Sequence, residues 1–404
     1  MLTNRVEQHL IKKNNQIWKI IDQMCFKSKN VYNYANYIIR QEFINNNRWI
    51  RYNELANVVK DSEPYKELGS NVGQQTLKVL DKNWKSFFTS IKDWSINKDK
   101  YLGRPRLPKY KDKETGRCSL IIDNIKVFVT DGYVRFSWKP LQCLNRNFKT
   151  KANGKLMQVR FVPKGKDYVM EIVYEIEVPD IQEQSNNIIS IDIGIDNLAT
   201  VSNNLGLQPF IINGRPLKSM NQYYNKEKAR LQSDLKTIHD KNWSNRLQKL
   251  TTKRNNKIND YIHKASKKII NWCVLNNIDT IIIGKNKNWK QKSDMSKKVN
   301  QKFVGIPHDL FIKKIKYKAE NAGIKLIETE ESFTSGTSFL DNEEPTKYYY
   351  DKSRRIQRGL FRSNKGVLIN ADLNGAYQIM KKVFPNAFAK GIEGAGLHPI
   401  RVNL

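Results

Sequence analysis

The order of strand-like and helix-like segments in the second half of this 404-residue chain limits its fold most strongly. The first three segments are short apolar runs of strand character separated by turns. Helices and strands then alternate. In chain order, the segments are strands at 188–194, 198–202 and 209–212, a basic helical stretch from 218 to about 275, a strand at 278–283, a helix from about 309 to 321, a strand at 324–329 and a helix from about 371 to 383.

The first half of the chain has a different pattern. Residues 15–101 have apolar side chains at helical spacing, and two prolines then break the chain near Pro105 and Pro108. Alternating strand-like stretches follow as far as about residue 174, and they predict β-hairpins in a small barrel that the first 14 residues could join. With the second half, which suits an RNase H-like sheet, the sequence predicts a multidomain α+β / α/β protein.

The net charge indicates the kind of partner. Lys and Arg number 71 against 39 Asp and Glu, a net charge of +32, and 10% of the residues are aromatic. Folded domains with a polyanion-binding surface fit these values better than a disordered basic tail. A membrane surface is the main rival partner, but the longest apolar runs, such as 278–283, are too short to span a bilayer.

The cysteines and the first residues indicate in which cellular compartment the protein is found. The four cysteines are scattered without a C-x-x-C pair, so neither disulfides nor a thiolate zinc site is indicated. The first residues do not resemble a secretory signal peptide. A reducing cytoplasm is therefore expected.

Three acidic positions stand out against this basic background. Asp192 interrupts the apolar strand 188–194, where strand alternation places it with Ser190 and opposite Ile191. Asp372 lies in the first turn of the last helix, and the acidic run 328–331 ends a strand. Each has an ordinary structural alternative: a satisfied strand-end Asp, a helix cap or a solvated strand end. Together they could converge at the carboxyl edge of one sheet and hold Mg²⁺ for phosphodiester cleavage.

Several short motifs resemble those of one family. Residues 190–195 and 370–376 resemble the first and third RuvC motifs, with Asp192 and Asp372 at the acidic positions. Three further segments resemble the family's Y-K-A-E-x-x-G helix, its Y-T-S segment and its P-R-F-P-x-Y-K stretch; they are residues 317–323, 332–335 and 103–111. In this order, the motifs make the chain similar to the TnpB family of transposon-encoded RNA-guided DNA endonucleases, which is related to compact type V CRISPR effectors.

The resemblance implies a domain plan. It assigns residues 1–14 and 102–182 to a wedge β-barrel, 15–101 to a helical recognition insert and 183–404 to a RuvC nuclease domain. Within the nuclease domain, residues 215–275 would be a basic helical insertion and 334–368 a degenerate zinc-ribbon-like loop.

The resemblance also implies an activity. It would be the Mg²⁺- or Mn²⁺-dependent cutting of double-stranded DNA beside a short flanking motif, directed by a transposon-derived guide RNA. The partners would be that RNA and the target DNA, with no membrane, and the location would be the prokaryotic cytoplasm, at the nucleoid when DNA is bound. Whether one or two copies bind an RNA stays open.

The second RuvC carboxylate departs from the family pattern. A glutamate usually ends the central strand, but here Ile283 is followed by Gly284. Some members appear to carry this acid on the adjacent strand, which points to Glu331, with Glu330 as the alternative because strand alternation forbids both from pointing inward. The expected catalytic and metal-binding set is therefore Asp192, Glu331 and Asp372. A nuclease-dead RNA-guided repressor is the alternative.

The zinc ribbon also departs from the pattern. Family members often carry two cysteine pairs before the last RuvC motif, whereas the nearby positions here are Ser338, Asp341, Ser363 and Lys365. Without thiolates, no bound zinc is expected.

Basic and polar residues in five regions are candidate nucleic-acid contacts, although a solvated role is open for each. They are Lys27, Lys29, Asn30, Tyr32, Asn33, Arg106, Lys109, Lys111, Arg230, Arg246, Arg254, Lys285, Arg354, Arg355 and Arg358. Two further functions stay open: a type V effector with a CRISPR guide, and a transposase that uses the same fold for strand transfer.

Overall fold

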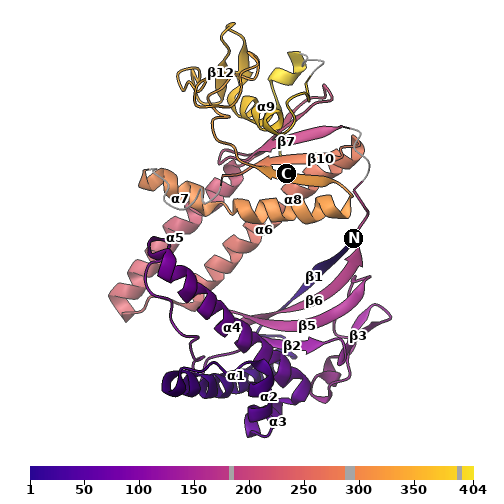
Figure 1. The fold of residues 1–404 in the computed structure, drawn as a ribbon, viewed down its shortest axis with the longest axis vertical. Helices are drawn as coiled ribbons and strands as arrows, with labels where there is room; N and C mark the ends of the chain where they lie inside the picture. Colours follow the sequence, from indigo (N-terminus) through magenta and orange to yellow (C-terminus); the bar gives the residue numbers. More distant parts are fainter. Residues whose placement is uncertain (182–185, 287–295, 389–393) are drawn as a thin grey trace. The chain divides into compact units, whose positions relative to one another are not determined.

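The computed structural model describes residues 1–181, 186–286, 296–388 and 394–404. The chain forms two compact units, an N-terminal unit of Leu2–Glu177 and a C-terminal unit of Val178–Leu404 with Met1 (Figure 1). Each unit has its own buried apolar core. Within the described residues, no helix is long and apolar enough to cross a membrane.

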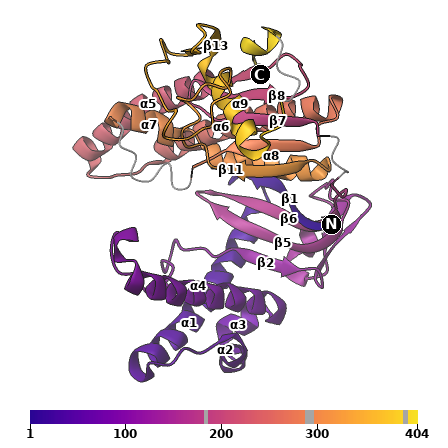
Figure 2. The ribbon, with the colours of Figure 1, turned by 45° about the horizontal axis from the view of Figure 1, so that its top comes forward.

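The N-terminal unit contains an antiparallel sheet of four strands in the order β1-β6-β5-β2 (Figure 2). Its strands are β1 (Leu2–Ile11), β2 (Leu120–Asp123), β5 (Lys155–Lys164) and β6 (Asp167–Glu177). β1 pairs with β6 along its whole length, so the first strand joins this sheet. The expected closed barrel is not formed by these ladders, because β2 has only four residues and the chain after it forms a separate hairpin of β3 (Val127–Thr130) and β4 (Tyr133–Phe136).

Four α-helices fill the expected helical stretch of this unit. They are α1 (Trp18–Asn46), α2 (Tyr52–Val59), α3 (Glu63–Leu68) and α4 (Ser70–Ile96). The apolar faces of α1 and α4 pack together around Trp84, which is fully buried. The indole Nε1 of Trp84 donates to Asn36 Oδ1 at 2.9 Å, so the one polar atom of this ring is satisfied inside the core. Short 3₁₀ turns cover Lys98–Lys100 and Lys139–Leu144.

The C-terminal unit contains a six-stranded sheet in the order β11-β10-β7-β8-β9-β14. Its strands are β7 (Ile188–Asp192), β8 (Asn197–Asn203), β9 (Phe210–Asn213), β10 (Thr280–Gly284), β11 (Lys325–Thr329) and β14 (Ile400–Val402). The first three are antiparallel neighbours, while β10 runs parallel to β7 and β11 parallel to β10. This is the mixed sheet that the segment order predicts, extended by the unpredicted edge strand β14.

Five helices belong to this unit within the described residues: α5 (Arg215–His239), α6 (Asn245–Leu275), α7 (Lys297–Gly305), α8 (His308–Asn321) and α9 (Ala371–Val383). The basic stretch expected as one helical region is two helices, because Asp240 takes a left-handed conformation after α5 and Ser244 caps α6 by accepting from Leu247 N. α7 was not predicted.

The two faces of the sheet are covered by different helices. Apolar residues of α6 and α8 pack with Ile189 and Ile191 on one face. α9 packs on the other face with Ile188 and Ile282 (Figure 1). Between β11 and α9, the chain forms an extended loop and a hairpin of β12 (Leu360–Arg362) and β13 (Leu368–Asn370). A final 3₁₀ turn covers Gly394–Leu397.

Candidate active site

Three of the acidic residues meet at one edge of the C-terminal sheet. β7, β10 and β11 are parallel, so their carboxyl ends lie at the same edge. Asp192 ends β7, and Glu331 follows the last residue of β11 by two positions. Asp372 comes from the first turn of α9, where Asn370 Oδ1 accepts from the backbone N–H of Asp372. All three carboxylates line one pocket of about 350 Å³, a size in the range of ordinary ligand sites.

Strand alternation and one glycine position Asp192. Ser190 and Asp192 lie on the face of β7 covered by α9, as predicted, and the Ser190 hydroxyl donates to the carbonyl of Ala376 at 2.5 Å. A Cβ atom at position 375 would lie 3.1 Å from Asp192 Oδ2. Gly375 therefore allows α9 to approach the carboxylate closely, which gives the glycine in the 370–376 motif a steric role.

Glu331 occupies the space beside the glycine that ends β10. A Cβ atom at position 284 would lie 3.0 Å from Glu331 Oε2 and 3.2 Å from its Cβ. Asn286 fixes the position of Glu331 on both sides, because Asn286 Oδ1 accepts from Glu331 N at 3.1 Å and Asn286 Nδ2 donates to Glu331 Oε1 at 3.3 Å. Glu331, two residues beyond the end of β11, thus lies against the glycine at the end of β10.

The adjacent glutamates point elsewhere. Glu330 is exposed and does not line the pocket. Glu328 Oε2 lies 3.3 Å from Lys285 Nζ, which also pairs with Asp309 at 3.1 Å. Of the two glutamates that alternation kept apart, the structure places Glu331 in the pocket, the one that directly precedes the 332–335 segment.

Burial and mutual repulsion raise the proton affinity of two of these acids. Loss of hydration raises the pKa of Asp192 well above its usual range, and the negative charges of Asp372 and Glu331 add to this effect while Arg355 opposes it. Burial raises the pKa of Glu331 to about 7. Three carboxylates here face the single positive charge of Arg355, and a bound cation would balance the others.

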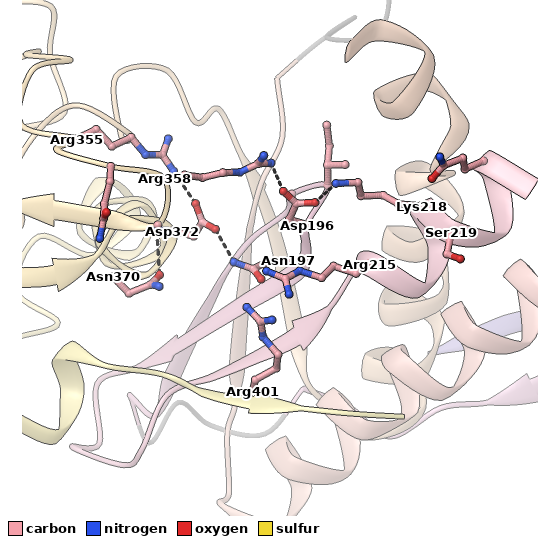
Figure 3. Close-up of a pocket in the computed structure, with 15 residues that line it drawn as sticks. Asp196, Asn197, Arg215, Lys218, Ser219, Arg355, Arg358, Asn370, Asp372 and Arg401 are labelled. Atoms are coloured by element: carbon pink, nitrogen blue, oxygen red, sulfur yellow. Dashed lines mark hydrogen bonds and ion pairs between the residues drawn. The ribbon is translucent and has the colours of Figure 1, made fainter. Parts of the chain in front are cut away.

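Asp372 is held by two neighbouring side chains. Arg355 Nη2 donates to Asp372 Oδ1 at 2.7 Å, and Asn197 Nδ2 donates to Asp372 Oδ2 at 2.7 Å (Figure 3). Within the described ranges, no three His, Cys, Asp or Glu side chains are grouped closely enough to hold a metal ion. The three carboxylates share a pocket, but Arg355 occupies the position of a counter-cation at one of them.

Two buried oxygens nevertheless suit a hard cation with its water shell. Asn197 Oδ1 and Thr200 Oγ1 both line the carboxylate pocket, and neither has a hydrogen-bond partner in the part of the chain described here. Buried polar atoms without a partner are uncommon in native proteins. Carboxylate and amide oxygens with bound water are the donor set that Mg²⁺ prefers, so the residues present fit this ion.

A larger cavity of 1080 Å³ adjoins the carboxylate pocket through Asn197, Arg355 and Asp372. Its charged lining includes Arg215, Lys218, Arg358, Arg401 and Asp196 (Figure 3). Lys218 and Arg358 both pair with Asp196. Arg215 and Arg401 carry no ion pair or side-chain hydrogen bond within the described ranges, and both are exposed. The cavity therefore leads to the carboxylates along a surface of net positive charge.

Arg355, Arg358 and Asp372 of this cavity were named from the sequence, but Arg215, Arg401 and Asn197 were missed, as was Asn286 beside Glu331. Arg401 lies on the three-residue strand β14, which has no sequence signal. Arg215 lies before residue 218, where the predicted basic helical stretch begins. Asn197 and Asn286 are ordinary loop asparagines by sequence. Of these, only Asn197 had a usable signal, its place two residues after the 190–195 motif.

The predicted contacts of the N-terminal unit divide into buried and exposed groups. Lys29 is 3% exposed and its ammonium donates to the Lys113 carbonyl at 2.7 Å, while Tyr32 is equally buried and accepts from Asn83. Both are used internally, because the face of α1 that carries them packs on the following segments. Asn33 Nδ2 donates to the Lys111 carbonyl. Five predicted contacts remain. Lys27 is half-buried and pairs with Glu67, and Asn30 is half-buried. Arg106, Lys109 and Lys111 are exposed, and the Lys111 ammonium lies 5.7 Å from the Tyr32 ring centroid.

The predicted contacts of the C-terminal unit divide similarly. Arg354 is half-buried and donates two hydrogen bonds of 2.7 and 2.8 Å to Glu343, so it organises its own loop. Arg254 bonds Asn221 and the Gly305 carbonyl. Arg230, Arg246 and Arg358 are exposed. Among the described residues, Arg230 pairs with acids of its own helix and Arg358 pairs with Asp196.

Two family models match this sequence. The OrfB_IS605 family, described as a probable transposase, matches residues 171–290, and the Cas12f1-like TNB domain matches residues 308–379. The two matches cover β7, β10, α8 and α9 and include Asp192, Glu331 and Asp372. They confirm the resemblance to the TnpB family that the motifs indicate.

Solved structures of RNA-guided effectors are similar over nearly the whole chain. A Cas12f1 complex with guide RNA and target DNA is 16% identical with a TM-score of 0.37, and the match covers 93% of this chain and 98% of that one. The mini-RNA-guided endonuclease Cas_phi3 is 9% identical with a TM-score of 0.49, covering 94% and 92% of the two chains. A search of the curated proteins found no match.

Proposed function

We propose that this protein is an RNA-guided DNA endonuclease whose C-terminal unit is a RuvC nuclease domain. The observation that carries the proposal is the convergence of Asp192, Glu331 and Asp372 in one pocket, inside the region matched by the two family models. The strand order supports it, since three antiparallel strands followed by two parallel ones agree with an RNase H-like sheet. The net charge of +32 suits a protein that carries guide RNA while handling target DNA.

The three carboxylates would hold Mg²⁺ or Mn²⁺. Bound divalent ions would stabilise the attacking and leaving oxygens of phosphodiester hydrolysis. The chain's own residues prepare the site: Asn286 orients Glu331, and Gly375 lets Asp192 lie against α9. Arg355 must release Asp372 before that carboxylate can bind a metal ion. Arg215 and Arg401 lie where a strand leading to the carboxylates would place its phosphates.

One observation favours a second candidate, the nuclease-dead RNA-guided DNA binder. Arg355 neutralises Asp372, and the described residues contain no ready-made metal cluster. A lasting ion pair at this position would leave guided binding intact and abolish cutting. The two candidates differ only in whether the pair opens.

Glu331 and Glu330 offer a matched test. The protein, purified with its co-expressed native flanking transcript, is given plasmid DNA that carries the guide-matched target and Mg²⁺. The parent and the Glu330→Ala variant should linearise the plasmid, and Glu331→Ala should lose at least about a hundredfold in rate, the effect of removing one transition-state stabiliser. Cutting by Glu331→Ala at the parent's rate would remove Glu331 from the site.

The glycine beside Glu331 supplies a rescue. A Cβ atom at position 284 would lie 2.6 Å from Ile379 Cδ1 and 3.0 Å from Glu331 Oε2, so Gly284→Glu alone should be crowded and slow. The triple variant Gly284→Glu/Glu331→Ala/Ile379→Val removes both of these atoms and should recover part of the lost rate. Guided binding by the parent without any cutting supports the nuclease-dead reading. RNA-independent strand joining supports a transposase, and guiding by a CRISPR transcript but not the flanking one supports a type V effector.

A further inference from the structure

The N-terminal unit has a pocket of its own, apart from the acidic residues discussed above. It has a volume of 520 Å³ and is built from α1, α4 and the loop at residues 104–109. Its apolar lining consists of Phe43, Phe87, Phe88, Ile91 and Leu107. Its charged lining consists of Arg40, Arg104, Arg106 and Lys109, without a carboxylate.

Packing from behind holds the phenylalanine rings in place. Phe88 lies against Trp49 with a ring-centroid distance of 4.7 Å, and Phe43 packs edge-on against the buried Trp84 at 5.6 Å. Phe87 packs against Phe88 at 5.1 Å and remains half-buried. The pocket therefore has aromatic walls that are rigid and still accessible. Because these side chains are already held in place, binding a ligand would cost little further side-chain entropy.

The cationic side is fixed by hydrogen bonds from α1. Asn36 Nδ2 and Arg40 Nη1 both donate to the Pro108 carbonyl at 3.1 Å, and the Arg40 guanidinium stacks 5.0 Å from the Tyr110 ring centroid. These contacts hold the proline-containing loop against the helix. Arg106 and Lys109 are exposed and have no ion-pair or side-chain hydrogen-bond partner in the described part of the chain.

We propose that this pocket binds a single unstacked nucleotide, with its base against Phe87 and its phosphate at Arg106 and Lys109. The lining requires an occupant with a flat apolar face beside a negative charge, and a nucleotide has both. Base stacking on aromatic side chains tolerates any base, and arginine contacts to the phosphate are independent of sequence. The inference rests on the proposed handling of nucleic acid and does not depend on cleavage.

Fluorescence of a base analogue tests the proposal. Full-length protein, expressed without the transcript and stripped of nucleic acid in high salt, is titrated in EDTA with single strands of about 12 nucleotides, DNA or RNA, that carry one 2-aminopurine. Stacking on Phe87 should quench the fluorescence. The Phe87→Leu variant, which keeps an apolar side chain in the cluster, should lose the quench and bind at least about fivefold more weakly.

Control variants for the loss of a positive charge and for the loss of an aromatic ring are available in the N-terminal unit. Arg106→Gln should weaken binding and flatten its dependence on salt, whereas Arg146→Gln removes the same charge at an exposed position outside the pocket and should have a smaller effect. Phe128→Leu, at a 45% exposed ring on β3, should bind and quench like the parent. Melting curves confirm that each variant is folded.

The outcomes separate the possibilities. A quench with RNA alone assigns the pocket to the guide, a quench with DNA alone assigns it to the target, and a quench with both makes it a general nucleotide site. Quench and affinity that are the same in Phe87→Leu, Phe128→Leu and the parent would overturn the proposal. A protein that binds and quenches but never cuts would reject the proposed endonuclease and leave this pocket standing.

Discussion

Glu331 and Gly284 are a complementary pair of residues on neighbouring strands. A Cβ atom at position 284 would lie 3.0 Å from Glu331 Oε2 and 2.6 Å from Ile379 Cδ1, both closer than ordinary contacts. Glu331 therefore occupies space that is free only because residue 284 is a glycine. If the proposed site is correct, Glu331 supplies from beyond β11 the carboxylate that the resemblance expects at the end of β10.

The raised pKa of Glu331 predicts an unusual dependence of stability on pH. Its pKa is about 7 in the folded protein against an ordinary value of 4.5, so the folded state binds the proton more tightly than the unfolded chain. Without metal, the contribution of this group to stability is complete below about pH 4.5 and is lost as the pH rises through about 7. The total loss is at most about 3 kcal/mol, and the raised pKa of Asp192 acts in the same direction.

Urea unfolding in EDTA measures this effect. The Glu331→Gln variant has no proton to lose, so its C-terminal unit should be more stable than that of the parent at about pH 8.5 and nearly equal to it near pH 4.5. Glu330→Gln, at an exposed position, should follow the parent at every pH. Added Mg²⁺ should stabilise the parent at high pH and not Glu331→Gln. Parallel pH profiles for parent and Glu331→Gln would contradict the buried state of Glu331.

Individual residues were predictable where a local rule fixed them. Alternation placed Asp192 on the face of β7 that α9 covers, and it separated Glu331 from Glu330. The pairing of Arg355 with Asp372 was not predictable, because it joins residues on opposite sides of a hairpin whose geometry no local pattern sets. The burial of Lys29 was not predictable for a related reason, because the sequence of a helix does not show which loop will cover a given lysine.

The loop that precedes α9 is held together by a buried polar network. Glu343 lies at its centre and is buried: it accepts two hydrogen bonds from Arg354, one from Ser338 N and one from Asn364 Nδ2. Asp341 Oδ2 accepts from Asn364 N. The resemblance led us to expect a degenerate zinc ribbon around Ser338 and Asp341, and in the structure both residues belong to this network.

This network predicts the behaviour of the loop. Glu343→Gln keeps the shape of the side chain and removes the nearer acid paired with the half-buried Arg354, leaving Asp341 at 3.9 Å, which should cost about 1–3 kcal/mol locally. Hydrogen exchange should therefore quicken in residues 336–366, while the N-terminal unit stays protected. Lys352→Gln removes an exposed charge from the same loop and should leave the exchange unchanged.

A chelator distinguishes this network from a metal site. EDTA should not alter the exchange of the parent loop, since the sequence has no thiolates for zinc there. Replacing both partners, as in Glu343→Leu/Arg354→Met, should restore much of the protection, because a buried ion pair can be exchanged for apolar packing. Loss of protection on chelation would show that a metal ion, and not this pair, holds the loop.

At the level of elements, the sequence predicted five of the six strands of the C-terminal sheet. The apolar runs located β7 to β11, α8 and α9 to within a few residues, because each buries side chains with a clear period. The ladders of the N-terminal unit form a four-stranded sheet and a separate hairpin, an arrangement that was not predictable because hairpin signals do not say whether a sheet closes. β14 was missed because three largely exposed residues form a strand only when β9 is in place to pair with them.

The whole molecule is two structures joined in one chain. One apolar core lies entirely within residues 11–172, and the others lie within residues 188–380 apart from a few packed neighbours near the end of the chain. Stability should therefore divide into two parts, each supplied by the contacts inside one unit. The carboxylate pocket belongs to one unit and the aromatic pocket to the other.

This division predicts that residues 1–177 fold alone. The fragment keeps β1, β2, β5 and β6 together with α1 and α4, so it should melt cooperatively by circular dichroism and retain the quenching of 2-aminopurine by the aromatic pocket. A shorter fragment of residues 1–101 is the control: it keeps the same helices but loses core residues such as Phe161 and Ile172, and it should not melt cooperatively. A 1–177 fragment that lacks a cooperative transition would show that the N-terminal fold depends on the C-terminal unit for its stability.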